Sequence, residues 1–361
     1  MPKPEETSRD DGSFPFQESV MSKSVLRMRP RETRPAFAIH PREEWRLDSK
    51  VAFLASPQSY PERPWRVEAI QTHMSWIFLT EHHAFKLKKP VSYDYLDFST
   101  LEARHRWCRE EVRINRRLAP GVYLTTIPLT VGEEGMLEVG GLGPIVDWLV
   151  MMRRLPSDRM LDAVIRRGTL TNEDVASLAG RLAGFYVQTP PVSVDPSSRL
   201  WNLKLNIEGN HDGLETVGFG LDHRRVDTLH RWQLDWLKEH SALAAKRAAA
   251  GRVVEGHGDL RAQHVCLLRP PAAPVVIDSV EFNRDFRLLD VGEELASLAM
   301  ECERMGEERI GPALLSSYEE ATGDVISAPL FRFYKVYRAY LRARLSISHL
   351  LDPTVGRSAR W

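Results

Sequence analysis

The sequence has few cysteines, no net charge and no long apolar run, and each shortage excludes a class of protein. Its 361 residues include three cysteines, none in a CxxC pair, so neither a disulfide framework nor a cysteine-based zinc site is expected. The 49 basic and 49 acidic residues cancel, so no overall field attracts nucleic acid or an anionic membrane. No apolar run approaches the length that spans a bilayer, and the N-terminus lacks the apolar core of a signal peptide. A cytoplasmic globular protein that binds neither nucleic acid nor membrane is therefore predicted.

The first 45 residues lack the composition of a folded segment. They are rich in Pro, Arg, Glu and Ser and poor in aliphatic residues, so they cannot bury enough surface to offset their ordering entropy. We therefore predict a disordered extension. Its basic cluster, residues 27–34, is either a contact patch for a protein partner, which the sequence does not identify, or a solvated tail, and we favour the tail.

The sequence also has no GxxxxGK[ST] pattern, so a stand-alone chain without a P-loop domain is expected.

What is present is a stretch that places two aspartates around a hairpin. An apolar run leads into His257-Gly258-Asp259, and residues 265–268 and 274–277 are typical of two strands joined by a proline-rich turn. Asp278 follows the second strand directly. Phosphoryl transfer needs such a pair of carboxylates, one to orient the attacking hydroxyl and one to hold a metal ion on the nucleotide phosphates.

An antiparallel sheet is predicted ahead of this stretch. β-branched and aromatic residues are concentrated in three segments, residues 65–70, 76–80 and 84–88. The glycine-free link at residues 71–75 is either an ordinary hairpin turn or a phosphate-covering loop, in which the hydroxyls of Thr72 and Ser75 contact phosphates. Lys86 and Lys88 lie two residues apart, so both side chains point to one face of their strand.

A helix over residues 99–118 supplies a third charged group. Ser99 and Glu102 have the spacing of a capping box, and Ala119-Pro120-Gly121 ends the pattern. At about 100° per residue, Glu111 falls within the apolar face while five arginines take the opposite face. Because an unpaired buried charge is costly, Glu111 is expected to have a cationic partner.

The remaining pattern predicts two more strands and then mainly helices. The strands are residues 122–131 and 148–152. The helices are residues 171–188, 226–250, 307–321 and 330–351, with residues 201–208, including Asn202 and Asn206, joining the first two. Asp290, three residues before Glu293, is expected to cap a further helix.

Three blocks of the sequence, residues 71–76 with 84–91, 96–120 and 256–299, resemble the aminoglycoside phosphotransferase-like family, which shares the protein-kinase fold. More specifically, they look like the phosphotransferase-like domain that precedes a P-loop ATPase domain in many bacterial proteins. The resemblance extends over residues 46–350. It implies a bilobal α+β fold with an antiparallel sheet and one helix in a nucleotide-binding lobe, residues 46–150. A mainly helical lobe for catalysis and substrate binding, residues 151–361, follows.

The resemblance also implies ATP and Mg²⁺ as cofactors, with Mn²⁺ as the alternative metal, and a small hydroxyl-bearing substrate. Asp259 becomes the catalytic base, and Asp290 an additional brace for its loop. The other implied site residues are His257 and Arg261 beside the base, Lys88 or Lys86 with Glu111, Thr72 and Ser75 at the phosphates, Met152 at the adenine, and Asp278, His264 and Glu281 at the metal.

His264 departs from the kinase pattern, which has an asparagine five residues after the catalytic aspartate. Imidazole is a poor ligand for Mg²⁺ and a better one for transition metals. Four alternatives to an ordinary Mg²⁺-dependent kinase therefore stay open: a one-metal or Mn²⁺ enzyme, a His257/His264/Cys266 zinc site, a nucleotide-binding pseudokinase, and transfer of AMP instead of the γ-phosphoryl group.

Overall fold

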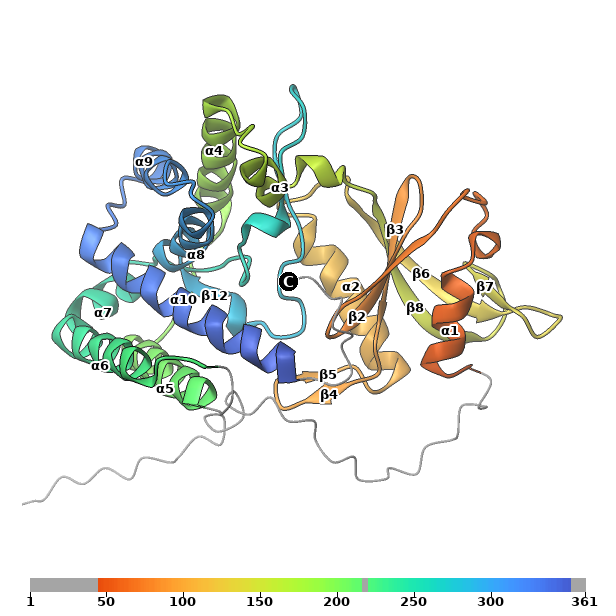
Figure 1. Ribbon diagram of the computed structural model, residues 1–361, viewed down its shortest axis with the longest axis horizontal. Helices are drawn as coiled ribbons and strands as arrows, with labels where there is room; N and C mark the ends of the chain where they lie inside the picture. Colours follow the sequence, from red (N-terminus) through yellow and green to blue (C-terminus); the bar gives the residue numbers. More distant parts are fainter. Residues whose placement is uncertain (1–44, 216–219, 352–361) are drawn as a thin grey trace, which may run out of the picture.

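The computed structural model describes residues 45–215 and 220–351 of the chain, which form two lobes (Figure 1). The predicted extension, residues 1–45, lies outside the described residues except for Trp45. One lobe is built on an antiparallel sheet and the other on helices. The bilobal α+β fold expected from the sequence is thus confirmed. None of the described helices is both long enough and apolar enough to cross a membrane.

The N-terminal lobe has a six-stranded sheet in the order β1-β2-β3-β8-β6-β7, in which every neighbouring pair is antiparallel. Its strands are β1 (Glu68–Gln71), β2 (Ser75–Leu79), β3 (His83–Lys88), β6 (Tyr123–Val131), β7 (Leu137–Val139) and β8 (Ile145–Arg153). A short helix, α1 (Leu47–Leu54), precedes them, and a small hairpin of β4 (Ser92–Tyr93) and β5 (Leu96–Asp97) follows β3. The strand β7 has no counterpart in the sequence prediction.

The helix α2 (Leu101–Asn115) packs against β6 and β8 of this sheet. Its cap differs from the prediction, because Thr100 is the N-cap and its side chain accepts a hydrogen bond from Ala103 N. Ser99 instead donates from its backbone N and its hydroxyl to Asp97. The face prediction holds, since Glu111 is buried while Arg109 and Arg113 are exposed. This orientation places Glu111 beneath the sheet.

The C-terminal lobe contains eight helices in its described part, and two predictions here were wrong. The predicted helix over residues 226–250 is two helices that meet at His240, and the predicted linker over residues 201–208 lies inside a 20-residue helix. The helices are α3 (Leu161–Arg166), α4 (Asn172–Gln188), α5 (Pro196–Glu215), α6 (His223–Glu239), α7 (Ser241–Ala249), α8 (Val291–Arg304), α9 (Ile310–Thr322) and α10 (Ala328–Leu351).

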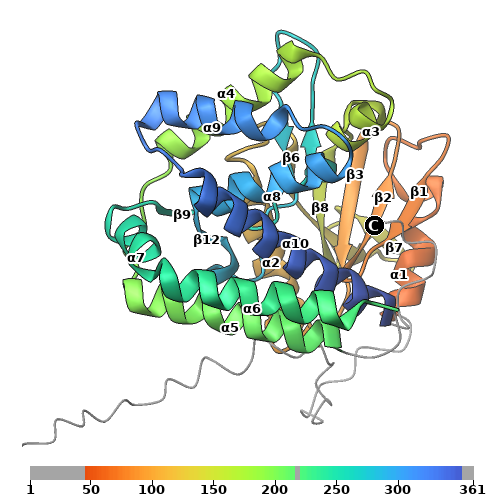
Figure 2. The same ribbon diagram turned by 60° about the vertical axis from the view of Figure 1, so that its left-hand side comes forward.

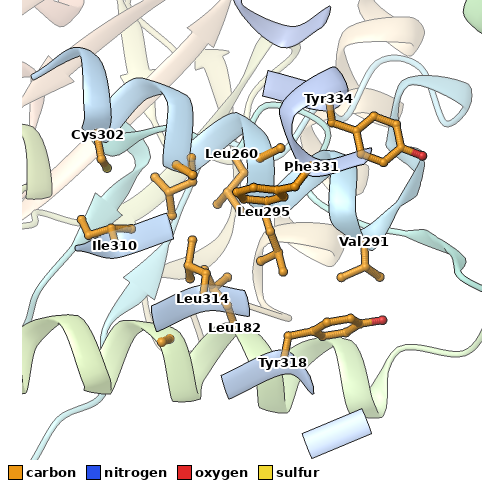
Figure 3. Packing of buried hydrophobic residues seen from close by; sticks show 14 of the residues in the cluster. Leu182, Leu260, Val291, Leu295, Cys302, Ile310, Leu314, Tyr318, Phe331 and Tyr334 are labelled. Carbon is orange, nitrogen blue, oxygen red and sulfur yellow. The ribbon is translucent and has the colours of Figure 1, made fainter. Parts of the chain in front are cut away.

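The core of this lobe holds the loop that carries Asp259. Leu260, the next residue, is fully buried, and Figure 3 shows it among side chains of α8 and α10 such as Leu295 and Phe331. Burying a leucine stabilises a fold by about 1.5–3 kcal/mol. Leu260 therefore anchors the loop, and Asp259 is left at the edge of the core.

Short strand pairs connect the lobes. The predicted hairpin is confirmed, with β10 (Val265–Cys266) antiparallel to β11 (Val275–Val276). A second pair, β9 (Val253–Glu255) with β12 (Leu288–Asp290), aligns the entry to the Asp259 loop with the start of α8. Both aspartates consequently emerge from strand ends between the two lobes.

Candidate active site

A cavity of about 340 Å³ lies between the lobes. This is within the range of about 300–1,000 Å³ that is usual for small-molecule sites. Its walls come from the β1–β2 turn, from β3, from the loops after β9 and β11, and from α5, α8 and α10. Of the residues named from the sequence, the cavity is lined by Thr72, Ser75, Lys86, Asp259, Arg261, His264, Asp278 and Glu281. His257, Lys88, Glu111 and Met152 do not line it.

The two lysines of β3 share Glu111 but occupy different places. Lys86 Nζ donates to Glu111 Oε1 at 2.8 Å and to Asp278 Oδ1 at 2.7 Å, and it lines the cavity. Lys88 is fully buried, and its Nζ contacts Glu111 Oε2 at 2.6 Å and Glu281 Oε1. The predicted cationic partner of Glu111 is confirmed, and Glu111 has two such partners, Lys86 and Lys88. Of the two lysines, only Lys86 lines the cavity, so Lys86 has access to a bound phosphate.

Burial and the opposite charges within this group together set the pKa of each member. Burial lowers the pKa of Lys86, but the carboxylates of Asp278 and Glu111 outweigh burial and hold that pKa well above its usual value. Burial raises the pKa of Glu111, but the two lysines hold it below its usual value. For Glu281 burial wins over Lys88, and the pKa is raised. The lysines and Glu111 are accordingly charged at neutral pH.

Asp278 has an unusual backbone, with φ at 64° in a non-glycine residue. Its N–H donates to the hydroxyl of Tyr123 at 3.0 Å, which ties it to β6 of the sheet. Its side chain is 45% exposed in the cavity. Left-handed backbone is uncommon outside glycine, and such strained residues cluster at functional sites because the surroundings must hold them there.

The Asp259 loop is held by a carboxylate that the sequence did not reveal. Glu294 of α8 accepts from His257 N at 2.6 Å and from Gly258 N, and it also accepts from the hydroxyl of Tyr186 at 2.8 Å. Gly258 has φ at +91°, and an added Cβ would lie 3.1 Å from Phe286 O, so only glycine fits this turn. A buried glutamate four residues after a helix cap gives no sequence signal, because its partners are distant backbone groups.

Asp290 does not brace this loop, contrary to the expectation. It caps α8 by accepting from Gly292 N at 2.8 Å, as predicted from its position. Both of its carboxylate oxygens also accept from Arg247, a buried residue of α7. The physical reason is the position of Asp290 at the start of α8. Glu294, one turn later, is the residue that contacts the loop.

His257 is fully buried and supports the loop from within. Its Nε2 is 2.8 Å from Ile277 O, so Nε2 carries the proton and donates, while Nδ1 accepts from Asp259 N at 3.3 Å. Burial, aided by His264, lowers the pKa of His257 to about 4. The imidazole is therefore neutral and links Asp259 to the residue before Asp278.

Asp259, Arg261 and His264 are the residues of this loop that line the cavity. The Asp259 carboxylate is 3.7 Å from Arg261 Nη1 and 3.9 Å from His264 Nδ1. Burial raises the pKa of Asp259, but His264 and Arg261 outweigh it and hold the pKa below its usual value. Asp259 is thus ionised, and among the described residues none donates a close hydrogen bond to its carboxylate.

The residues around Asp278 fit a divalent cation. His264 Nδ1 lies 2.8 Å from the carbonyl oxygen of Asp259 and must donate to it, so in the neutral ring Nε2 has a free lone pair. That Nε2 is 3.7 Å from Asp278 Oδ2. A carboxylate oxygen suits Mg²⁺, which is usually held by one or two carboxylates together with phosphates, and the added imidazole suits Mn²⁺. Glu281 fits less well as a ligand because Lys88 already occupies its Oε1.

Other predicted contacts are weaker in the structure. The Thr72 hydroxyl donates to Ser75 O and accepts from Ser75 N, both at 3.0 Å, so this turn uses its own polar groups. Met152 is buried, and its backbone is registered with Ala84 on one side and Tyr123 on the other. It contacts the apolar cluster between the lobes instead of the cavity.

The alternative zinc site is not supported. Cys266 is fully buried and burial raises the pKa of its thiol to about 11, so it is not a ready thiolate ligand. Within residues 45–215 and 220–351, the ligand atoms close enough together for a metal site belong to another group, His211, Glu215 and Asp227.

No family model matches the chain. The chain is similar to uncharacterized proteins of Mycobacterium tuberculosis and Mycobacterium bovis, with 30% identity over 286 residues. The match covers 77% of this chain and 54% of each relative, so the chain spans about half the length of the curated relatives it matches.

Solved structures of small-molecule kinases are also similar. A choline/ethanolamine kinase family protein from Mesorhizobium loti has 13% identity and a TM-score of 0.45, with 83% of this chain and 84% of that chain covered. An aminoglycoside phosphotransferase from Streptomyces rimosus has 16% identity and a TM-score of 0.44, with 76% and 92% covered. These TM-scores lie below 0.5, so the assignment of the fold rests on the elements described above.

Proposed function

We propose that the protein is an ATP-dependent phosphotransferase that moves the γ-phosphoryl group of ATP to a hydroxyl of a small molecule. The observation that carries this proposal is the convergence of three groups on one cavity. These are Asp259, Asp278 and the ion pair of Lys86 with Glu111. We keep for each residue the role predicted from the sequence. Of the two lysines, we propose that Lys86 contacts the phosphates.

The proposed reaction is an in-line transfer. The hydroxyl of the acceptor attacks the γ-phosphorus and gives its proton to Asp259, while the bond to the β–γ bridging oxygen breaks and ADP leaves with the electron pair. Lys86 neutralises charge on the phosphates, and Glu111 holds Lys86 in place. Asp278 and His264 would hold a divalent cation, which would supply further neutralisation of charge on the phosphates. Most of the rate gain then comes from positioning and electrostatics.

Thermal unfolding with and without ATP tests the nucleotide site. Ligand at about a hundred times its dissociation constant adds about 2.7 kcal/mol to the free energy of unfolding, so the midpoint should rise in the presence of ATP with Mg²⁺ or Mn²⁺. The rise should disappear in Asp278→Ala. Asp235→Ala, which removes an exposed carboxylate of α6, is the matched control and should keep the full rise. Absence of any rise with either metal would exclude the proposal.

A second candidate, a nucleotide-binding pseudokinase, is favoured by one observation. The β1–β2 turn contains no glycine, and the Thr72 hydroxyl and two backbone N–H groups are consumed within the turn. Fewer donors then remain to hold the transferring phosphate. ATP turnover that is lost in Asp259→Asn supports the enzyme, whereas metal-dependent ATP binding without turnover supports the pseudokinase. Release of pyrophosphate instead of ADP would point to AMP transfer.

A further inference from the structure

The wall of the cavity between α5 and α10 carries more positive charge than its carboxylates balance. Arg199 and Arg338 both pair with one buried carboxylate, that of Glu293, with Arg338 Nη1 at 3.7 Å from Oε1. In the described part of the chain, Arg344 has no carboxylate within 4.0 Å, and its Nη1 donates to Asn210 Oδ1 at 3.1 Å. Two guanidinium groups therefore share one carboxylate, and the third has none within 4.0 Å among the described residues. We call Arg199, Arg338, Arg344 and Asn210 the arginine wall.

The arginine wall also contains donors without acceptors among the described residues. Asn210 is fully buried, and since its Oδ1 accepts from Arg344, its Nδ2 is a donor that has no partner. Arg338 Nε likewise has no partner. A buried donor that stays unsatisfied costs about 1–3 kcal/mol. Both residues line the cavity, although these two nitrogen atoms are themselves covered by protein.

The packing of α10 against α5 brings the residues of the arginine wall together. Arg199, Asn206 and Asn210 lie on one face of α5 because they are spaced at i, i+7 and i+11. Figure 2 shows α10 crossing α5 and α6, and α5 and α10 are in contact. Gly213, one turn further along α5, leaves room for Arg344, whose Cγ would lie 2.7 Å from a Cβ added at that position.

The other charged residues of the cavity are closer to balance, which localises the excess. Arg261 and Arg342 of the cavity face Asp259 and Glu301, and the exposed Arg304 also contacts Glu301. Asp285 also lines the cavity, but it is exposed and, among the described residues, no arginine lies within 4.0 Å of it. The surplus is thus confined to the arginine wall.

The arginine wall begins beside the proposed catalytic base. Arg338 Nη2 donates to Gly258 O at 3.0 Å, and Gly258 directly precedes Asp259. Another side of the same cavity is apolar, with Tyr95, Phe282 and Phe286 in ring contact. A ligand that spans these features has a hydroxyl at Asp259, carbon atoms against the aromatic rings and a negative group at the arginines.

We infer that the acceptor is an anion, a hydroxyl-bearing small molecule whose carboxylate or phosphate monoester is bound by the arginine wall. The role of its hydroxyl rests on the proposed function, whereas the anion site does not. Guanidinium groups bind carboxylates and phosphates through charge-assisted, frequently paired hydrogen bonds. A polyamine or a quaternary ammonium compound, in contrast, is repelled by three arginines that have a single carboxylate, Glu293, paired with them.

Calorimetric titration with inorganic phosphate, acetate and tetramethylammonium tests the anion site. The full chain is first saturated with a non-hydrolysable ATP analogue and Mg²⁺, so that the nucleotide's phosphate positions are filled. Phosphate or acetate should bind and tetramethylammonium should not. The tighter of the two anions identifies the phosphate monoester or the carboxylate as the ligand group. No anion binding, or binding of tetramethylammonium alone, would overturn the inference.

Substitutions then locate the bound anion. Arg344→Gln should weaken anion binding about tenfold or more, because a charge-assisted pair is lost. Arg332→Gln, which removes an exposed arginine of the same helix, should leave the dissociation constant unchanged. Arg338→Gln is a second variant in case Arg344→Gln unfolds, and the thermal midpoint of each variant verifies folding. Equal affinity in the wild type and in both folded wall variants would contradict the inference.

A last pair of titrations separates this inference from the proposed function. Without nucleotide, phosphate binding should be weakened about tenfold or more in Arg344→Gln and kept in Lys86→Met. If the protein binds no nucleotide, the proposed function fails, yet this pattern still supports the anion site. The opposite pattern, loss in Lys86→Met alone, places the phosphate at the lysines and refutes the anion site at the arginine wall.

Discussion

The two ends of the cavity have opposite charge balances. At the lysine end, Lys86 and Lys88 face three carboxylates, those of Glu111, Asp278 and Glu281. At the arginine wall, Arg199 and Arg338 pair with Glu293, and Arg344 has no carboxylate within 4.0 Å in the described part of the chain. The first end has no uncompensated positive charge and needs an added cation to accept phosphates, whereas the second can accept an anion directly. The proposed function accordingly puts the metal–nucleotide complex at the lysine end and an anionic acceptor at the arginine wall.

The strongest way to test this division is to remove the group between the two ends. Asp259→Asn should lower the rate of ADP formation about 100-fold or more, because the acceptor loses its base. The affinities for nucleotide and for inorganic phosphate should stay within about twofold, since neither end is altered. Initial rates and calorimetry measure both quantities. A variant that keeps more than a tenth of the wild-type rate would show that Asp259 is not the base.

At the lysine end, substitution of Lys88 should mainly lower stability, whereas substitution of Lys86 should mainly weaken nucleotide binding. Lys88→Met leaves Glu111 and Glu281 buried without their shared cation and should cost about 3–5 kcal/mol in the free energy of unfolding, measured with urea. Lys86→Met should cost less, because its partner Asp278 is half exposed, and should weaken nucleotide binding about tenfold or more. If Lys88→Met were as stable as the wild type, the buried ion pairs would not support the site.

The neutral histidine beneath the loop predicts a dependence of stability on pH. The folded pKa of His257 is about 4 against an ordinary 6.5, so on acidification the unfolded chain binds a proton before the folded protein does. Stability contributed by the neutral ring is therefore present above pH 6.5 and is lost between pH 6.5 and 4, by about 3 kcal/mol in total. Urea unfolding at pH 8, 6 and 4.5 measures it. His257→Gln, which can still donate to Ile277 O, should lack this component, and an identical pH profile in both proteins would contradict the assignment.

The smallest effect is expected at the packing of the arginine wall. Gly213→Ala pushes on Arg344 and should weaken phosphate binding by a few-fold, with little change in nucleotide affinity. Gly180→Ala is the matched control, because its added Cβ in α4 meets nothing within 4 Å. It should stabilise the protein by up to about 1 kcal/mol through helix propensity alone. Equal phosphate affinity in both variants would separate Gly213 from the anion site.

The lysine end could be predicted from the sequence because its signals are local. The period of two placed Lys86 and Lys88 on one face of a strand, and the helical period placed Glu111 inside. The hairpin that delivers Asp278 was indicated by its own proline-rich turn. What local patterns could not decide was which lysine lines the cavity, since that depends on Asp278, which lies 192 residues further along the chain.

The arginine wall could not be predicted, because no short pattern marks it. Its residues come from α5 and α10, which meet only in the folded lobe, and their charges are ordinary for exposed helices. The helix α5 itself was missed because Asn, His, Asp and Gly near its end have low helix propensity. Packing against α6, α7 and α10 overrides that preference. Glu294 was missed for a similar reason, since its partners are backbone groups of a distant loop.

Because its three native cysteines are buried, the protein can be labelled selectively at one introduced cysteine. All three are buried, and burial raises the pKa of Cys108 to about 12 and that of Cys266 to about 11, with Cys302 also raised. Because the thiolate is the reactive form, maleimide reagents at neutral pH should spare all three in the folded state. One cysteine introduced at an exposed position such as Arg332 then becomes the single point of attachment for a fluorophore, with no need to remove the native thiols.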